Sequence, residues 1–539
     1  MEKAVLEEDQ RDQADRNWAA PDPAFANWRV LLPAPANGVF HHLALFGGPE
    51  GLDRLLVELK AAERVSRPIS PPCSADAVAL LAGAPPSLRT VAACLKPGGA
   101  LYWEIERFGA ARLRLTPGRI FRALRASGFT PTGIYLIRPR SGPAEVFVPL
   151  DVSGAVAWCA DTFWRGWVGA VAALFPRCSR ALAAIAAPRI AITALAEGGR
   201  DPLSSVIDRG RIGERLRYST ARPLVCFRSH SRRTVIFPFS ENGRSPEAVL
   251  KFSPLRERAS RTANEQQTLS EIRSRLDPEM ARTIPEPMGT FQWSGLTVGM
   301  ESFLPGRSVG RAASRPMVPL RKKLRDLDRV TEWLCRFQIS NQFGRPAWGS
   351  AEWSLERWVE GPLRLFEREF TLTRNEERLF AATREAARAL VGIPLPVVLS
   401  NWSFSLGNVC RTDDRILVYD WETVTRGLPL ADLVYFLMDW GRLMRKGASA
   451  SWKISFRQLL VEPRKNDRIS TALQRSMARY FVELDIDPRF RPLLCVLTWV
   501  HRAERRLLKN HQASRTLDAR LRALAETGDL IFAGGPVGR

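Results

Sequence analysis

Two neighbouring segments restrict the fold of this chain more than any other part of its sequence. The first, L-S-N-W-S-F-S-L-G-N over residues 399–408, has the composition of a loop and ends on Asn408. The second, R-I-L-V-Y-D-W-E over residues 415–422, is a strand-like apolar run that leads to Asp420. Sites that hold Mg²⁺ against nucleotide phosphates use an amide and a carboxylate in this layout. The two segments therefore predict that Asn408 and Asp420 bind one magnesium ion.

A lysine and a glutamate upstream supply the other groups that such a site needs. Lys251 lies in a strand-like run, A-V-L-K-F, and Glu265 lies on the helix predicted to follow it. A triphosphate is neutralised by a strand lysine that a helix glutamate holds in place. The linker M-E-S-F-L-P-G over residues 300–306 follows the next predicted strand. We expect its backbone to meet the adenine, with Glu301 and Phe303 at the nucleotide.

These motifs, in this order, resemble those of the aminoglycoside/choline phosphotransferase family, whose members have the protein-kinase-like fold. That family carries H-G-D-x-x-P-x-N, a metal motif such as D-W-E, the motif D-P-x-x-D-L and a hinge E-x-L-P-G. The matching residues here are Gly407–Asn408, Asp420–Glu422, Leu428–Leu433 and Glu301–Gly306. The resemblance covers roughly residues 223–530, a little over half of the chain.

The resemblance implies phosphorylation of a small-molecule hydroxyl group, with ATP and Mg²⁺ as cofactors. It places Lys251 on the nucleotide phosphates and makes Asn408 and Asp420 the ligands of Mg²⁺. The implied architecture is an α+β, bilobal protein-kinase-like domain in the C-terminal part. Its strand-rich N-lobe would span residues 219–305, and its helical C-lobe would span residues 306–532.

The loop departs from the family pattern at two positions. Ser403 stands where the family has its catalytic aspartate, and Asn401 stands where it has a histidine. A serine does not accept a proton at neutral pH without a base of its own, and losing general-base help costs about 10²–10⁴ in rate. Transfer need not stop, because the transition state is loose. Two hypotheses therefore remain: a small-molecule kinase with an atypical loop, or an inactive pseudokinase scaffold that binds nucleotide or a partner.

The loop before the second predicted strand of the N-lobe, S-H-S-R-R, lacks the glycines that usually cover nucleotide phosphates. One of its arginines, Arg232 or Arg233, is the residue there that we expect to contact phosphate.

The N-terminal part has a different pattern, in which short apolar runs alternate with helical stretches. The motifs L-K-P-G-G-A-L at residues 95–101 and L-R-A-S-G-F at residues 124–129, followed by a predicted hairpin, resemble a class I S-adenosylmethionine-dependent methyltransferase. We therefore expect a flexible tail over residues 1–26, an α/β Rossmann-like domain over residues 27–198 and a linker over residues 199–218.

The cofactor turn of such a methyltransferase is an acidic residue followed by a glycine-rich run. The nearest match, H-L-A-L-F-G-G-P-E-G over residues 42–51, has glycines but no acidic residue before them. The favoured hypothesis is a methyltransferase-like domain that is kept for packing or partner binding, and methyl transfer is the alternative.

Charge and cysteine content bear on the partners and the compartment. The net charge of +23 comes mostly from arginines that are dispersed along the chain, so it does not predict a nucleic acid partner. The eight cysteines form no C-x-x-C pair, which favours reduced thiols in the cytoplasm over zinc or disulfides. The sequence indicates no oligomeric state.

The longest apolar region, residues 181–196, is interrupted by Pro188, so we expect no integral membrane segment. Tryptophans and arginines over residues 158–182 would suit an interfacial helix in peripheral membrane contact. A helix of the protein core explains them equally well.

Overall fold

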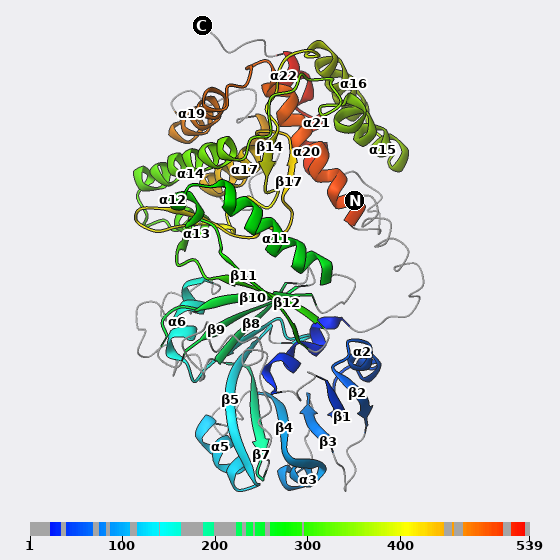
Figure 1. Ribbon diagram of the computed structural model, residues 1–539, viewed down its shortest axis with the longest axis vertical. Coiled ribbons are helices and arrows are strands. Elements are labelled where there is room, and N and C mark those ends of the chain that lie inside the picture. The colour runs from blue at the N-terminus through cyan, green and yellow to red at the C-terminus, as the bar shows by residue number, and fades with distance from the viewer. Residues whose placement is uncertain are drawn as a thin grey trace. The chain divides into compact units, whose positions relative to one another are not determined.

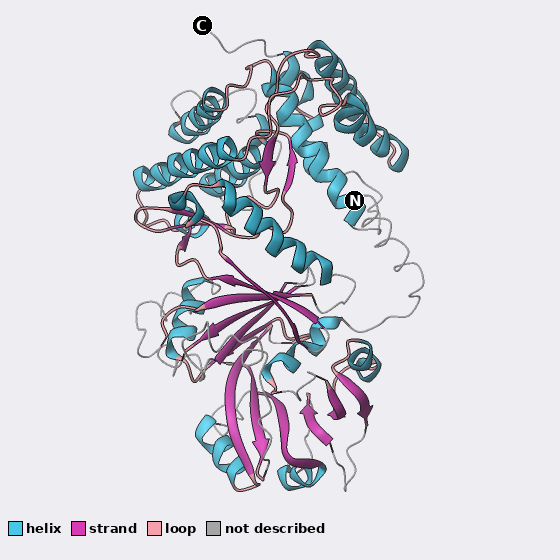
Figure 2. Cartoon of the chain, viewed as in Figure 1, coloured by secondary structure: helices cyan, strands magenta, loops and turns pink. Residues whose placement is uncertain are grey.

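The computed structural model describes residues 22–33, 39–67, 75–81, 87–107, 116–139, 141–162, 187–198, 222–228, 233–240, 243–253, 259–293, 296–446, 455–457, 467–509 and 519–533. The chain forms two compact units. The first consists of Met1–Gln267 and Pro287–Phe303, and the second of Thr268–Glu286 and Leu304–Arg539. Figure 2 shows that strands dominate the first unit and helices the second. Among the described residues, no helix is both long and apolar enough to cross a membrane.

A twelve-stranded sheet runs through the first unit in the order β11-β12-β10-β9-β8-β6-β5-β7-β4-β3-β1-β2 (Figure 1). Alternate residues of a strand point to opposite faces, and neighbours such as Val78 and Ala79 belong to different hydrophobic clusters. Both faces of central strands such as β3 and β7 are therefore buried, whereas the edge strands β11 and β2 are largely exposed. The strands are β1 (Phe40–Phe46), β2 (Ala62–Ser66), β3 (Ala75–Leu80), β4 (Leu95–Glu106), β5 (Phe129–Arg138), β6 (Val146–Pro149), β7 (Arg189–Ala196), β8 (Arg222–Arg228), β9 (Arg233–Phe239), β10 (Ala248–Phe252), β11 (Pro287–Trp293) and β12 (Leu296–Ser302).

The N-terminal strands form the parallel part of this sheet. β1 pairs in parallel with β2 and β3, and β3 pairs in parallel with β4. Helix α2 (Leu52–Glu58) connects β1 to β2, and α3 (Leu88–Cys94) connects β3 to β4. Helix α3 begins after a capping serine, because Ser87 Oγ accepts the backbone N–H of Thr90 at 3.1 Å. These elements make an α/β arrangement, whereas the assignment to a Rossmann-like methyltransferase domain stays a prediction.

Two further helices, α5 and α6, belong to this part of the chain. Helix α5 (Pro117–Arg125) leads into β5, which forms the predicted antiparallel hairpin with β6. Helix α6 (Ser153–Thr162) carries Trp158, whose ring packs on Phe237 with centroids 5.0 Å apart. Trp158 is partly buried and packs against a hydrophobic cluster of the first unit. The rest of the interfacial helix that we considered, residues 163–182, lies outside the described residues.

The predicted N-terminal tail ends earlier than expected. Residues Pro23–Leu31 form a 3-10 helix, η1, on the sheet. Ala24 and Trp28 are buried, and Trp28 stacks on Tyr102 with ring centroids 4.9 Å apart. Burial of this apolar surface fixes residues 23–26, so the prediction that the flexible tail extends to residue 26 is wrong.

One antiparallel pairing joins the N-terminal strands to the strands that follow the predicted linker. Phe147 of β6 lies opposite Val225 of β8. Residues 27–198 and 219–305, which the sequence predicts as separate domains, thus contribute to one sheet in one compact unit. The predicted domain bounds stay predictions, and the linker over residues 199–218 lies outside the described residues.

Strands β8, β9, β10, β12 and β11 are antiparallel to their neighbours, and helix α11 (Ala259–Arg275) follows β10. Helix α11 approaches β12 closely at Gly299. A Cβ atom at this position would lie 2.8 Å from Cγ2 of Thr262 and 3.3 Å from Nε2 of Gln266, both on α11. Glycine at position 299 therefore allows the helix to lie against this face of the sheet.

The second unit is mainly helical and contains two small sheets, β13-β15-β16 and β14-β17. Its core includes a stacked aromatic cluster in which Trp333 lies 5.1 Å from Phe337 and 5.9 Å from Phe404, centroid to centroid. The elements are α12 (Pro278–Ala281), β13 (Arg307–Ser308), α13 (Val309–Ser314), α14 (Leu320–Ser340), η3 (Glu356–Glu360), α15 (Gly361–Glu369), α16 (Arg374–Ala389), β14 (Val398–Ser400), β15 (Val409–Arg411), β16 (Ile416–Val418), β17 (Thr425–Gly427), α17 (Ala431–Lys446), α19 (Arg468–Glu483), α20 (Phe490–Lys509), α21 (Ala519–Ala525) and α22 (Gly528–Ala533).

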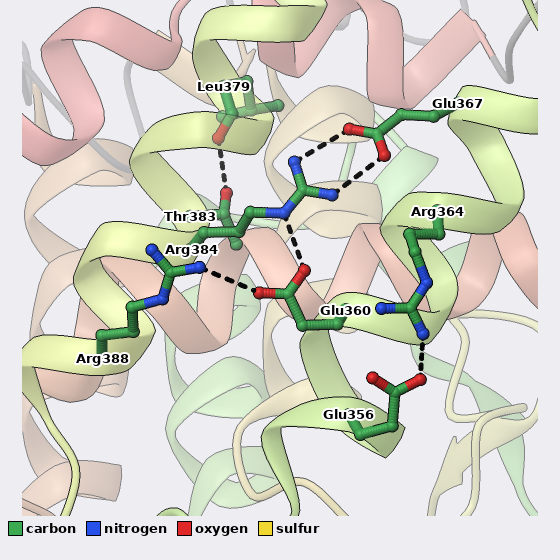
Figure 3. Close-up of polar contacts among 8 residues, drawn as sticks. All are labelled: Glu356, Glu360, Arg364, Glu367, Leu379, Thr383, Arg384 and Arg388. Atoms are coloured by element: carbon green, nitrogen blue, oxygen red, sulfur yellow. Dashed lines mark hydrogen bonds and ion pairs between the residues drawn. The ribbon is translucent and has the colours of Figure 1, made fainter.

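An ion-pair network ties η3 and α15 to α16 (Figure 3). The Nε of Arg384 donates to Glu360 at 2.8 Å, and its two Nη atoms donate to the two carboxylate oxygens of Glu367 at 2.8 and 3.0 Å. Arg388 adds a longer contact of 3.4 Å with Glu360. These bonds, above all those with Glu367, raise the pKa of Arg384. The bidentate pair with Glu367 adds geometric specificity to the contact between α15 and α16.

Candidate functional site

Lys251 is at the centre of a buried network of charged side chains in the first unit. Its Nζ lies 3.0 Å from Oε1 of Glu265 on α11 and 2.7 Å from Oε1 of Glu301 on β12. Arg233, at the start of β9, adds a second cation with its Nη1 2.7 Å from Oε2 of Glu265. These four side chains are between 1% and 11% exposed, so solvent screens their charges weakly. The predicted contact between Lys251 and Glu265 is present, and Glu301 and Arg233 extend it.

The register between β10 and β12 brings the second carboxylate to Lys251. Lys251 lies opposite Gly299, and Val249 lies opposite Glu301. Lys251 and Glu301 are therefore diagonal neighbours on one face of an antiparallel pair, within reach of a long side chain. Helix α11 occupies the space over Gly299 on the same face and delivers Glu265.

For both glutamates, burial raises the pKa of the carboxyl group and the nearby positive charges lower it. Burial favours a higher pKa for Glu265, but the positive charges of Lys251 and Arg233 outweigh it and lower that pKa. Burial raises the pKa of Glu301 to about 7 despite Lys251, and the negative charge of Glu265 adds to this rise. Oε2 of Glu301 is buried and has no hydrogen-bond partner among the described residues. Glu265 is therefore the permanent counter-ion of Lys251, whereas Glu301 changes its charge near neutral pH.

The segment that we predicted as a linker starts later than expected. Residues 300–302 belong to β12, and Glu301 pairs there with Val249 on one side and Pro287 on the other. Phe303 follows the strand, and its ring packs on Trp158 with centroids 6.0 Å apart. Ladder pairing thus extends through residue 302, and the connecting segment begins at Phe303. The roles of Glu301 and Phe303 at a nucleotide stay predictions.

Arg233 joins the charged network around Lys251, and its contact with phosphate stays a prediction. Its guanidinium is 6% exposed and binds Glu265 inside the charged network, instead of extending from the loop that precedes β9. Arg232 lies outside the described residues.

In the second unit, Asp432 holds the start of the 401–408 loop. Its two carboxylate oxygens accept the backbone N–H groups of Asn401 at 2.7 Å and Trp402 at 2.8 Å. Burial raises the pKa of Asp432 to about 6, although both N–H groups and the charges of Arg502 and Arg505 act in the other direction. Asp432 is the aspartate of the motif L-P-L-A-D-L over residues 428–433, so this motif serves to fix the shape of the loop.

Trp402 adopts a left-handed backbone conformation, with a φ of 57°. This conformation is unfavourable for a residue with a bulky side chain, and the family motif H-G-D has a glycine at the matching position. The surroundings hold Trp402 from both ends. Arg502 donates to its carbonyl oxygen at 2.8 Å, and its indole N–H donates to Oγ1 of Thr425 at 2.9 Å. The loop is therefore held in a strained shape by contacts on every side of one residue.

Ser403 and Asn401 hydrogen-bond within the same loop. Oδ1 of Asn401 accepts the backbone N–H of Ser403 at 3.0 Å, and Asn401 itself is 1% exposed. The hydroxyl of Thr423 donates to the carbonyl oxygen of Asn401 at 2.8 Å, which uses its single hydrogen. The hydroxyl of Ser403, 2.8 Å from Oγ1 of Thr423, must then donate to that oxygen. Among the described residues, the side-chain partner of Ser403 is thus a hydroxyl and not a carboxylate.

Asn408 and Asp420 lie side by side, as predicted. Nδ2 of Asn408 donates to Oδ2 of Asp420 at 3.1 Å and to the carbonyl oxygen of Ser403 at 2.9 Å. Both bonds use the amide nitrogen of Asn408, so Oδ1 is the atom it would offer to a cation. Asp420 has a left-handed backbone with a φ of 63°, and Trp421 beside it is buried.

The pair fits Mg²⁺ by its chemistry, because a carboxylate and an amide both bind through hard oxygen atoms. Mg²⁺ commonly takes one or two protein carboxylates and completes its shell with phosphates and water. In keeping with this, the described part of the chain has no group of three or more His, Cys, Asp or Glu residues placed to bind a metal ion. Residues Asn408 and Asp420 would thus be a minimal set that relies on the nucleotide.

Three residues of α20 line the loop without having been indicated by any sequence pattern. Besides Arg502, Arg505 places its guanidinium carbon 4.4 Å from the ring centroid of Trp402, and Nη2 of Arg505 donates to Thr425 at 3.0 Å. His501 lies edge-on to the same ring, with centroids 6.4 Å apart. These contacts join residues about 100 positions apart in the chain. The sequence of α20 contains several basic residues, a pattern that is typical of the exposed face of any helix and does not indicate a site.

Comparison with known proteins agrees with the C-terminal part of these findings. The model of the phosphotransferase enzyme family matches residues 231–453. This range contains all eight predicted site residues, and it supports a protein-kinase-like fold for the C-terminal part. Residues before 231, including the parallel strands, lie outside the match. No curated protein matches the chain in sequence.

Several solved structures resemble part of the chain. A thermostable mutant of aminoglycoside phosphotransferase APH(4)-Ia, in ternary complex with AMP-PNP and hygromycin B, has a TM-score of 0.38 and 13% identity, covering 62% of this chain and 100% of its own. Wild-type aminoglycoside 2'-phosphotransferase-IIIa with GDP has a TM-score of 0.36 and 15% identity, covering 60% of this chain and 96% of its own. Amicoumacin kinase hAmiN, in complex with AMP-PNP, has a TM-score of 0.32 and 13% identity. The match covers 58% of this chain and 89% of the kinase chain.

Proposed function

We propose that this protein transfers the γ-phosphoryl group of ATP to a hydroxyl group of a small molecule, with Mg²⁺ as cofactor. The observation that carries the proposal is the buried ion pair of 3.0 Å between Lys251 and Glu265, two residues that were predicted as a pair from their order in the sequence. The match of residues 231–453 to the phosphotransferase enzyme family supports it. Solved structures that resemble the chain are described as complexes with AMP-PNP or GDP.

Each residue has a defined role in this proposal. Lys251, held by Glu265, neutralises the nucleotide phosphates, and Asn408 and Asp420 offer the oxygen ligands for Mg²⁺. When bound, Mg²⁺ would neutralise charge on the phosphates. The 401–408 loop positions the acceptor hydroxyl, and Asp432 keeps this loop in shape through the N–H groups of Asn401 and Trp402.

The alternative is a pseudokinase scaffold that binds nucleotide without turnover. A specific observation favours it: the hydroxyl of Ser403 is directed to Thr423 and is not paired with a base among the described residues. The two candidates share the nucleotide site and differ in catalysis. Because a phosphoryl transition state is loose, positioning alone sustains some transfer, and we favour the enzyme.

Nucleotide binding is tested by the thermal shift of the full chain with AMP-PNP, with and without Mg²⁺. At a nucleotide concentration of about 100 times Kd, binding adds about 2.7 kcal/mol to the free energy of unfolding. We expect Asp420→Ala to remove the Mg²⁺-dependent part of this shift and Lys251→Met to weaken binding with or without Mg²⁺. Asp413→Ala, in the exposed turn before Arg415, is the matched control. A wild-type protein that shows no shift would refute the nucleotide site.

Turnover separates the two candidates once binding is established. Phosphorus NMR with ATP and a set of hydroxyl compounds reports a new phosphate ester directly. We expect slow transfer by the wild type and faster transfer after Ser403→Asp, alone or together with Asn401→His, because a general base adds about 10²–10⁴ in rate. Transfer that appears only in the restored variants would identify the natural chain as a pseudokinase.

For the N-terminal part we propose a packing role in which S-adenosylmethionine is not bound. Methyltransferase-like sheets bind their cofactor beyond the carboxyl ends of the first strands, and the turn after β1 holds Gly48 there with a φ of 82°. A Cβ at Gly48 would lie 2.9 Å from side-chain carbons of both Leu52 and Leu81, so apolar side chains close in on this turn. Equilibrium dialysis with labelled S-adenosylmethionine tests the proposal, and saturable micromolar binding would overturn it.

A further inference from the structure

Lys251 points to one face of the twelve-stranded sheet. It lies opposite Val235 of β9 in the antiparallel ladder, so both side chains point to that face. Phe237 and Phe239 follow Val235 at alternate positions of β9 and therefore point to it as well. They lie about 7 and 13 Å along the strand from Val235. This face, the Lys251 face, thus carries two aromatic rings beside the charged network.

The direction from Lys251 to these rings is also the direction to the segment that follows β12. Along β10 it leads from Lys251 to Ala248, which lies opposite Ser302 at the end of β12. Along β9 the same direction leads to Phe237 and Phe239. In the proposed function, Lys251 binds the phosphates and the segment after β12 meets the base. The base would therefore lie on the Lys251 face, at these two rings.

Trp158 of α6 occupies this position. Its ring centroid lies 5.0 Å from that of Phe237 and 5.7 Å from that of Phe239. It also lies 6.0 Å from the ring centroid of Phe303, the first residue after β12. Phe239 is fully buried, and Trp158 and Phe237 are partly buried. An indole is a planar fused bicycle similar in size to a purine, so it fills the corner in which the base would lie.

Helix α6 is anchored on the strands that carry the Lys251 face (Figure 1). A Cβ atom on Gly154, near the start of α6, would lie 1.7 Å from the carbonyl oxygen of Gly243 between β9 and β10. Glycine is therefore required for this approach. Val156 is fully buried in the same hydrophobic cluster as Phe239. These residues all belong to the first unit, and α6 precedes residue 231, at which the family match begins.

We propose that α6 is an autoinhibitory element, in which the indole of Trp158 occupies the position of the nucleotide base and has to leave before ATP binds. The inference rests on the proposed phosphotransferase function and names a regulation of that same site. Because the bound conformation requires a displaced α6, the affinity for nucleotide is lowered by the fraction of chains in which α6 is displaced. The contact of Lys251 with Glu265 does not involve Trp158, so binding of a phosphate chain alone is independent of this cover.

Titration calorimetry of the full chain with AMP-PNP and Mg²⁺, and with inorganic tripolyphosphate, tests the inference. Trp158→Ala removes the ring that covers the base position, so the Kd of AMP-PNP should fall by about 10-fold or more. The Kd of tripolyphosphate, which has no base, should stay the same. Trp103→Ala is the matched control, because Trp103 packs against the same cluster from β4, which β8, β6, β5 and β7 separate from β9. It should leave both Kd values unchanged.

Two further variants act on the same contact. Gly154→Ala leaves the indole intact and weakens the anchor of α6, so it should also lower the Kd of AMP-PNP. It is the second test in case Trp158→Ala does not fold. Trp158→Phe keeps a smaller ring and should lower the Kd by a smaller factor.

Hydrogen exchange of the wild type gives a readout that needs no variant. If α6 leaves when the nucleotide binds, AMP-PNP should reduce the protection of the peptide over residues 150–159, whereas a ligand that only binds beside this helix would increase it. The peptide over residues 100–106, which contains Trp103, is the internal control and should keep its protection.

Three outcomes would overturn the inference. They are weaker AMP-PNP binding by Trp158→Ala, an equal Kd in wild type, Trp158→Ala and Gly154→Ala, or a peptide over residues 150–159 that AMP-PNP leaves as protected as before. In each of these cases nucleotide still binds, so the phosphotransferase proposal stands. No binding of AMP-PNP or tripolyphosphate by the folded wild type or any folded variant would instead refute the phosphotransferase site, and the inference with it.

Discussion

The carboxylate of Asp432 accepts the backbone N–H of Trp402 at 2.8 Å, and Trp402 has a φ of 57°. The contact ties the N-terminus of α17 to the residue before Ser403. Asp432→Asn keeps the size and shape of the side chain but has one acceptor oxygen in place of two. One of the buried N–H groups of Asn401 and Trp402 therefore loses its partner. We expect a loss of about 1–3 kcal/mol in the local stability of the loop. Hydrogen exchange of the peptide over residues 399–406 measures it, and unchanged protection would contradict the assignment.

Asp432 also makes the stability of the loop depend on pH. Its pKa is about 6 in the folded protein, above the ordinary value of 3.8, so the folded state holds a proton that the unfolded state has lost. Its contribution to stability is complete below pH 4 and is lost as the pH rises through 6. We therefore expect protection factors of the 399–406 peptide to fall between pH 4 and pH 6.5 in the wild type. A variant with Asp432→Asn should lack this fall.

Glu301 should give the first unit a separate pH dependence near neutrality. Its pKa is raised from 4.5 to about 7, mainly by burial, so it stabilises the folded state at low pH and loses this effect as the pH rises through 7. In Glu301→Gln this dependence is absent. Calorimetry between pH 5 and pH 8 should show a smaller fall of Tm in Glu301→Gln than in the wild type. The exposed Glu50→Gln is the control and should follow the wild type.

Gly299 should not tolerate a methyl group. In Gly299→Ala the new Cβ would lie 2.8 Å from Thr262, so α11 or β12 must move, and we expect a loss of about 1–3 kcal/mol. Gly118→Ala on α5 is the matched control, because no atom lies within 4 Å of its Cβ position. It should be neutral or stabilising by about 0.4–1 kcal/mol. Urea unfolding of both variants tests the prediction, which equal midpoints would contradict.

Arg384 should stabilise the helices that it joins. It is 20% exposed and binds two glutamates, so Arg384→Met leaves Glu360 and Glu367 without their shared partner and should cost about 1–2 kcal/mol. Arg388→Met, at an arginine that is 68% exposed, should change stability by no more than about 0.5 kcal/mol. The two variants differ by four positions on one helix, and their Tm values can be compared directly.

Arg29 is a buried cation whose replacement should stabilise the protein. It is 4% exposed, burial lowers its pKa to about 10, and its Nη1 has no hydrogen-bond partner among the described residues. Arg29→Met keeps the apolar stem and removes the desolvated charge, so we expect a gain of about 1 kcal/mol or more. Arg125→Met, at an exposed residue, should be neutral. A loss of stability in Arg29→Met would indicate that this guanidinium binds a partner or ligand.

The sequence alone determined the local elements and the order of the predicted site. The short apolar run A-V-L-K-F predicts β10, because this signal depends on residues close in the chain. The order of Lys251, Glu265, Asn408 and Asp420 was sufficient to predict which of them pair within each unit. Both predicted contacts, Lys251 with Glu265 and Asn408 with Asp420, are present.

Only the tertiary structure decided the pKa values of the site residues and the contacts between distant elements. Glu301 has its pKa near 7 because β12 and α11 bury it beside Lys251 and Glu265, a relationship that no local pattern encodes. Arg502 reaches Trp402 across 100 positions, and Phe147 pairs with Val225 across the predicted domain boundary. Such contacts depend on which surfaces the folded chain brings together. Sequence patterns record the period of a helix or strand, and they do not record its neighbours.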